Sequence, residues 1–294
     1  MKFFLSDKSL QGMHLISKRH ALEVQLICSN EKFLSEILDK AIENKVDQLL
    51  CMFNPVLFKM LAENPKRWPF KVFAIVPHFS QFVRDTSHYG TTGAAIRRVM
   101  KMSLMQKAQL GIVALSNIHK VLKMRFDMMM NLFLMAESAQ FFLKSGVKIQ
   151  SIILHPQITD LALSLNQTEL FRLFCKIVKN QYGAEPGFST LNFSLLVETL
   201  QTAAIPAEWI VAPFNSKGYG MNPDSVQCNE WLNKNTPYKV IAEHWQLGNE
   251  IPLSEGLAYL KSISVFGSTI EFENFFTEES YSWLKHNPTR SLSI

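Results

Sequence analysis

The feature that most constrains this chain is a repeated alternation between short apolar runs and amphipathic helical segments. Runs such as Ser151–His155 and Glu208–Phe214 are almost continuously apolar, which is typical of parallel strands buried on both faces. Segments such as Phe33–Glu43 have apolar residues at the 3.6-residue period of a helix. Eight such units predict an α/β fold, a single (β/α)8 TIM barrel covering residues 1–294, although the length alone also allows two domains.

The first strand is the one that the pattern defines least. It is expected either at Gly12–Ser17 or at Glu23–Ser29. The remaining seven strands are expected at Val46–Asn54, Lys71–His78, Ile149–His155, Glu185–Thr190, Trp209–Asn215, Lys239–His244 and Ser264–Ser268.

One connection, Phe79–Lys148, is about twice the length of an ordinary crossover. It is rich in methionine and has a helical pattern, so we expect an extended helical insertion between strands three and four, over residues 79–148. Extra core packing, a lid and a partner-docking surface all remain open for this insertion. If the insertion is a docking surface, the partner could be a second copy of the chain, which would give a homo-oligomer.

Composition limits the class of protein. Apolar residues make up 47% of the chain, which indicates a buried core, and the net charge of +5 suits an anionic substrate without reaching a nucleic-acid signature. No run is long enough to span a membrane, and the segment Met1–Lys8 is not typical of a secretory signal. Cys28, Cys51, Cys175 and Cys228 form no CxxC pair and are expected to be reduced, so we expect a cytoplasmic protein.

Four segments in the second half carry a resemblance to a known family. Ile152–Pro156 is a strand ending in His-Pro, Pro186–Ser194 is a glycine-containing strand and turn, and Ala212–Asn215 is a strand ending in asparagine. Together with Val265–Thr269, which is followed by Glu273 and Asn274, they resemble strands four, five, six and eight of the aldo-keto reductase superfamily. The resemblance implies a TIM barrel, a nicotinamide cofactor such as NADPH and carbonyl reduction. The chain also resembles a group of uncharacterised barrel proteins, which implies no particular reaction.

The chain departs from the reductase pattern at two places. In that family a lysine ending the third strand lowers the pKa of a catalytic tyrosine, whereas the third strand here ends in Pro77 and His78. The segment Gly267–Phe275 also lacks the basic residues that hold an NADP phosphate in the family. Proton-transfer chemistry is therefore favoured over hydride transfer.

Polar residues at strand ends are the candidate functional groups, because the active sites of TIM barrels lie at the carboxyl ends of the strands. His155 is the leading acid–base candidate, since an imidazole titrates near neutral pH, although a structural hydrogen bond would also explain it. The full set of such residues is Asn54, His78, His155, Glu185, Thr190, Asn192, Asn215, Glu243, His244, Ser268 and Thr269.

Three of these residues, His78, His155 and His244, could bind a divalent metal with Glu243 or Glu185. No metal-binding spacing supports this alternative, and adjacent residues of one strand, here Glu243 and His244, point to opposite faces unless a bulge intervenes. No metal ligand is therefore assigned, and the cofactor stays unknown.

Several loops could bind an anionic substrate. Gly267, Ser268 and Thr269 are expected to form a phosphate-binding turn after the eighth strand, or else a simple tight turn. Asn215 could position substrate, while Asn192, Lys217 and Arg97 could contribute to binding. Lys217 lies beyond its strand in a loop, which does not suit a Schiff-base lysine.

These observations favour an enzyme of the lyase or isomerase class that moves protons on a small anionic or phosphorylated metabolite. His155 would be the acid–base group, with His78, His244 and Asn215 positioning the substrate. An NAD(P)H-dependent reductase and a non-catalytic barrel that binds a partner are the two alternatives. Neither nucleic acid nor a membrane is an expected partner.

Overall fold

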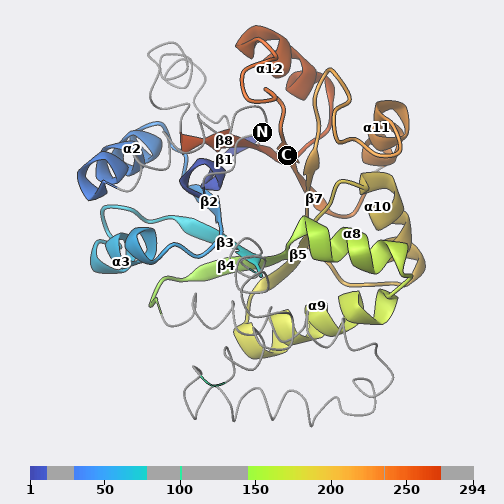
Figure 1. Cartoon of the computed structure of the whole chain (residues 1–294), viewed down its shortest axis with the longest axis horizontal. Coiled ribbons are helices and arrows are strands. Elements are labelled where there is room, and N and C mark those ends of the chain that lie inside the picture. The colour runs from blue at the N-terminus through green and yellow to red at the C-terminus, as the bar shows by residue number, and fades with distance from the viewer. Residues whose placement is uncertain (12–29, 78–99, 101–144, 235, 273–294) are drawn as a thin grey trace.

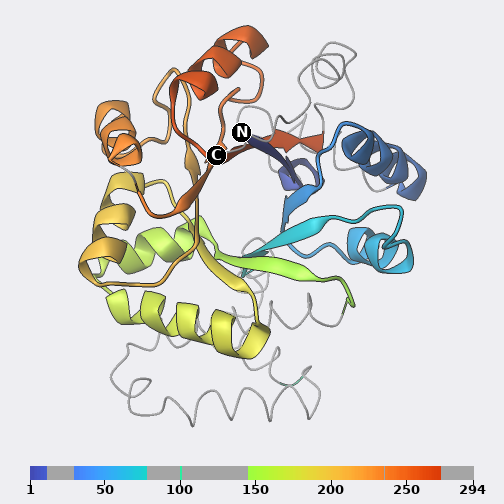
Figure 2. The ribbon, with the colours of Figure 1, turned by 180° about the vertical axis from the view of Figure 1, so that it is seen from behind.

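A computed structural model of the chain describes residues 1–11, 30–77, 100, 145–234 and 236–272. Eight parallel strands form a closed barrel in the order β1 to β8, and the helices lie around it (Figures 1 and 2). The strands are β1 (Lys2–Ser6), β2 (Gln48–Cys51), β3 (Lys71–Val76), β4 (Ile149–Leu154), β5 (Glu185–Ser189), β6 (Trp209–Pro213), β7 (Lys239–Glu243) and β8 (Gly267–Glu271). The (β/α)8 architecture expected from the alternating pattern is confirmed.

The helices follow the strands as the crossover pattern predicts. Helix α2 begins at Glu31, where the side chain of Asn30 accepts a hydrogen bond from the Lys32 backbone N–H. Asn54 caps α3 in the same way, and Pro55 occupies its first turn. The described helices are η1 (Lys8–Gln11), α2 (Glu31–Glu43), α3 (Pro55–Glu63), α8 (Pro156–Ser164), α9 (Thr168–Tyr182), α10 (Phe193–Thr202), α11 (Ser225–Asn233) and α12 (Leu253–Ser262).

The prediction of the first strand is wrong. The barrel begins at Lys2–Ser6, which pairs with β2 on one side and β8 on the other. Both segments proposed from the sequence, Gly12–Ser17 and Glu23–Ser29, lie outside the described residues and follow a strand that already closes the barrel. The helical insertion expected over residues 79–148 also lies almost entirely outside them, between β3 and β4.

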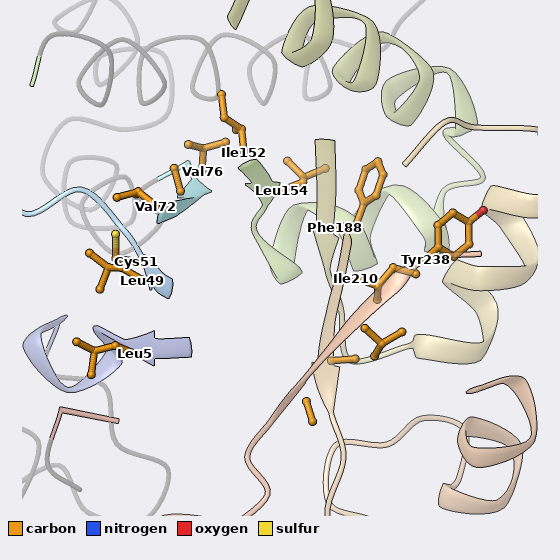
Figure 3. Packing of buried hydrophobic residues seen from close by; sticks show 14 of the residues in the cluster. Leu5, Leu49, Cys51, Val72, Val76, Ile152, Leu154, Phe188, Ile210 and Tyr238 are labelled. Atoms are coloured by element: carbon orange, nitrogen blue, oxygen red, sulfur yellow. The ribbon is translucent and has the colours of Figure 1, made fainter. Parts of the chain in front are cut away.

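Alternate residues of the strands pack on the two sides of the barrel wall. The outer side chains form one large cluster with the helices, and Figure 3 shows part of it, including Leu5, Val76, Leu154 and Phe188. The inner side chains form a second cluster of buried residues: Phe4, Leu50, Met52, Phe73, Ile75, Ile153, Trp209, Val211 and Ile241. The barrel interior is therefore a packed core, as this fold requires.

Aromatic rings fill the amino-terminal end of this interior. The ring centroids of Phe73 and Trp209 lie 4.8 Å apart and those of Phe4 and Phe73 lie 5.0 Å apart, both edge to face. The indole N–H of Trp209 donates to Glu185 Oε2 over 2.6 Å. Glu185 is the first residue of β5, so it lies at the opposite end of the barrel from the expected site, and its inclusion among the strand-end residues is wrong.

Among the described residues, no helix is long and apolar enough to cross a membrane. Cys51, Cys175 and Cys228 are free and buried, as expected for core-type thiols, whereas Cys28 lies outside the described residues.

Candidate functional site

Four polar side chains from distant parts of the sequence meet at the carboxyl ends of the strands, the end of the barrel called the mouth below. Lys8 begins η1, just after β1, and His155 follows β4. Glu243 is the last residue of β7, and His244 comes next. We call these four residues the mouth cluster.

The centre of the mouth cluster is an ion pair between the segment that follows β1 and the end of β7. Lys8 Nζ lies 2.8 Å from Glu243 Oε1. Lys8 follows β1 and Glu243 ends β7, and β8 lies between these two strands in the barrel. The side chain of Glu243 is only 6% exposed, whereas that of Lys8 is 22% exposed. The carboxylate is therefore buried, whereas the side chain of its lysine partner is partly exposed.

Charge–charge interactions keep Glu243 ionised in this buried position. Burial alone raises the pKa of its carboxyl, but nearby positive charge outweighs that effect, so the pKa lies below its usual value. The largest of these contributions comes from the charge of Lys8, whereas His244 and His155 contribute only when their rings are protonated. His155 therefore belongs to the same electrostatic environment as the ion pair.

His244 reaches the cluster through an unusual backbone conformation. Its φ angle is +57°, in the left-handed region that residues other than glycine seldom adopt. This turn brings both Glu243 and His244 to Lys8, with His244 Nε2 at 3.4 Å from Nζ. The expectation that adjacent strand residues diverge therefore does not hold here, because β7 ends at Glu243.

The imidazole of His244 is neutral at pH 7. Burial, and then the charge of Lys8, lower its pKa from 6.5 to about 4, while Glu243 opposes that shift. An ammonium group offers only donors, so Nε2 accepts the Lys8 hydrogen bond and the ring proton lies on Nδ1. Lys8 thus has two acceptors within reach, one anionic and one neutral.

His155 is placed at the mouth by the junction of β4 and α8. It is 7% exposed, its backbone N–H donates to Val76 O over 2.8 Å, and Pro156 opens α8 directly after it. Side chains two residues apart in an extended segment point to the same side, and Ile153 belongs to the inner cluster, so His155 also faces the barrel interior.

Asn215 has a structural role that the sequence did not reveal. Its Nδ2 donates to Tyr219 O over 2.9 Å, and its Oδ1 accepts from the Tyr219 backbone N–H over 3.0 Å. The oxygen and the nitrogen of the carboxamide therefore both bind the backbone of the loop that follows β6. Because both polar atoms of its side chain are engaged in these hydrogen bonds, Asn215 is not proposed to position a substrate.

The expected phosphate-binding turn is wrong, because Gly267, Ser268 and Thr269 lie inside β8. A Cβ atom on Gly267 would lie 2.5 Å from Phe4 Cε2 and 2.7 Å from Lys2 O. The glycine is therefore required by the close approach of Phe4 in the barrel interior. Ser268 is fully buried and Thr269 is 3% exposed.

Lys217 and Asn192, two more of the predicted residues, do not join the mouth cluster. Lys217 forms an ion pair with Glu250 over 3.4 Å, and both side chains are about half exposed. The backbone N–H of Asn192 donates to Thr190 Oγ1 over 2.8 Å at the start of α10. His78 and Arg97 lie outside the described residues.

Lys8 is the member of the mouth cluster that sequence reasoning missed. Its signal was a lysine three residues beyond a short apolar run, Phe3–Leu5, which the sequence pattern did not define as a strand. Within the described part of the chain, no group of three or more His, Cys, Asp or Glu side chains could hold a metal ion.

Comparison with known protein families finds no match to this chain, and comparison with curated proteins finds none either. The geometry of the mouth cluster is therefore the basis for a functional assignment.

Proposed function

We propose that this chain is an enzyme that transfers protons on a small anionic metabolite, in the lyase or isomerase class. The observation that supports the proposal is the mouth cluster itself, in which Lys8 is paired with the buried Glu243 beside a neutral His244. Buried, mutually perturbed titratable groups at the strand ends of a TIM barrel are typical of acid–base sites.

Each member of the cluster has a role that suits this chemistry. Removal of a proton next to a carbonyl group places negative charge on the carbonyl oxygen, and the ammonium of Lys8 would stabilise that charge. His155 would move the proton, because an imidazole ordinarily titrates near neutral pH. His244, held neutral, would orient Lys8 through Nε2, and Glu243 would hold the Lys8 ammonium in place through their ion pair.

The net charge of +5 and the partly exposed, cationic side chain of Lys8 favour a carboxylate or phosphate on the substrate. Carboxylates with an aldehyde or ketone group are the simplest metabolites that combine such an anion with an acidic C–H bond.

Incorporation of solvent deuterium tests this proposal without knowledge of the net reaction. In D₂O, the protein should label a member of a pool of carboxylate and phosphate metabolites, detected by mass spectrometry. His155→Ala should lower the labelling rate by about 100-fold or more, because it removes the group that moves the proton. Glu243→Gln should also lower the labelling rate, because it removes the anion that holds the Lys8 ammonium at the mouth.

Lys179→Met is the matched surface control, since Lys179 pairs with Glu208 over 3.6 Å in a half-exposed position. It should leave the labelling rate unchanged. Labelling that survives His155→Ala at the full rate would contradict the proposal, and labelling that depends on added NADPH would favour the reductase alternative.

A further inference from the structure

The mouth cluster holds a lysine whose surroundings suit covalent as well as electrostatic chemistry. We infer that Lys8 forms a protonated imine with an aldehyde or ketone substrate at the mouth of the barrel. This inference rests on the proposed proton-transfer function and deepens it, because it names the reactive group of the substrate.

The position of Lys8 allows a carbonyl compound to reach it. Its side chain is 22% exposed, although the carboxylate that it pairs with is almost completely buried. Lys217, the lysine in the loop that follows β6, is 50% exposed and pairs with a half-exposed glutamate. Lys8 is therefore the less exposed of the two, and it lies beside a buried carboxylate at the strand ends rather than in an exposed loop.

The two acceptors around Nζ provide a route for the proton that an ammonium group must lose. Glu243 Oε1 lies at 2.8 Å and His244 Nε2 at 3.4 Å, both within hydrogen-bond reach. The ion pair is the resting form of the site, because the pKa of Glu243 is lowered, so the neutral pair is reached only transiently during the reaction. In that neutral pair, Lys8 and Glu243 have lost their charges in the same step. The buried carboxylate is then never left ionised without its cation, which would be costly.

The bond changes balance without any additional reactant. The neutral amine attacks the carbonyl carbon and forms the C–N bond, and a proton moves from nitrogen to the former carbonyl oxygen to give a carbinolamine. Glu243 then returns its proton to that hydroxyl group, the C–O bond breaks with water as the leaving group, and the nitrogen lone pair completes the C=N bond. The sum is an ammonium and a carbonyl giving an iminium and water.

The product restores the charge pattern of the free site. The iminium nitrogen carries one positive charge, as the ammonium did, so Glu243 again has a cationic partner. The iminium withdraws electrons from the adjacent C–H bond more strongly than a carbonyl does, so it lowers the pKa of that bond. Imine formation would therefore assist the proton transfer assigned to His155.

Reductive trapping tests this inference on the full chain. With pyruvate or acetaldehyde and cyanoborohydride, peptide mass spectrometry should show Lys8 alkylated at least about tenfold faster than the surface residue Lys179. Lys8→Arg keeps a cation beside Glu243 but cannot form an imine, so it should fold normally and lose this fast labelling.

Alkylation of Lys8 no faster than Lys179 with both probes would overturn the inference. Deuterium incorporation measured on the same samples separates the two proposals. Incorporation without trapping overturns the imine alone, whereas trapping without incorporation into any metabolite supports the imine and overturns the proton-transfer function.

Discussion

Gly267→Ala is expected to destabilise the protein by about 3 kcal/mol, because it overpacks the barrel interior. The new Cβ would lie 2.5 Å from Phe4 Cε2 and 2.7 Å from the backbone oxygen of Lys2. The aromatic ring is itself held against Phe73 and Trp209, and the backbone of β1 is held by its pairing with β2 and β8. Neither contact can be relieved by rotation of a free side chain. Urea unfolding measures the change in the free energy of unfolding, and the dependence of that free energy on urea concentration should be unchanged.

Gly146→Ala provides a control for the loss of a glycine as such. Gly146 has a φ of +74°, and a Cβ atom there would have no other atom within 4 Å, so only backbone strain of about 1 kcal/mol is expected. A Gly267→Ala variant no less stable than Gly146→Ala would contradict the packing role of Gly267.

Lys8→Met is expected to cost about 3 kcal/mol or more at pH 7, because it leaves the carboxylate of Glu243 buried without its cation. Adding Glu243→Gln to this variant should recover a large part of the loss, since an amide carries no charge. Lys179→Met, which breaks an exposed pair, should cost no more than about 1 kcal/mol. Urea unfolding of the four proteins measures the coupling, and equal losses for Lys8→Met and Lys179→Met would contradict it.

The loss in free energy of unfolding caused by Lys8→Met should depend on pH in a definite direction. In the native protein the pKa of Glu243 is depressed, so its ionised form contributes stability above the usual carboxyl pKa of 4.5, and that stability is lost as the pH falls through the folded-state value. Without Lys8, the main effect on this pKa is burial, which raises it. The stability difference between the native protein and Lys8→Met should therefore narrow as the pH is lowered from 7 toward the acid range.

The barrel could be predicted from the sequence because most of its strands have apolar residues on both faces. The criterion failed at β8, whose inward positions are small or polar. In β8 the inward residues are Gly267, Thr269 and Glu271, so the apolar residues just before Gly267 were interpreted as the strand. The strand was consequently placed three residues too early, and its own residues were interpreted as a phosphate-binding turn.

The site was predicted in part. His155 directly follows an apolar run and His244 follows one after a single residue, Glu243, so their place at the mouth could be inferred from the sequence alone. Lys8 could not, because its strand was misplaced. The convergence of Glu243 and His244 on Lys8 depends on a left-handed φ angle at a residue that is not glycine, and no sequence pattern indicates that conformation.

The most direct test of the mouth cluster is an NMR titration of the His244 ring, assigned by comparison with His244→Asn. We expect a pKa of about 4, and a higher value in Lys8→Met, because the charge of Lys8 is one cause of the depression. A ring that titrates near 6.5 and does not respond to Lys8→Met would show that β1 and β7 do not bring these residues together, and would contradict the mouth cluster as described.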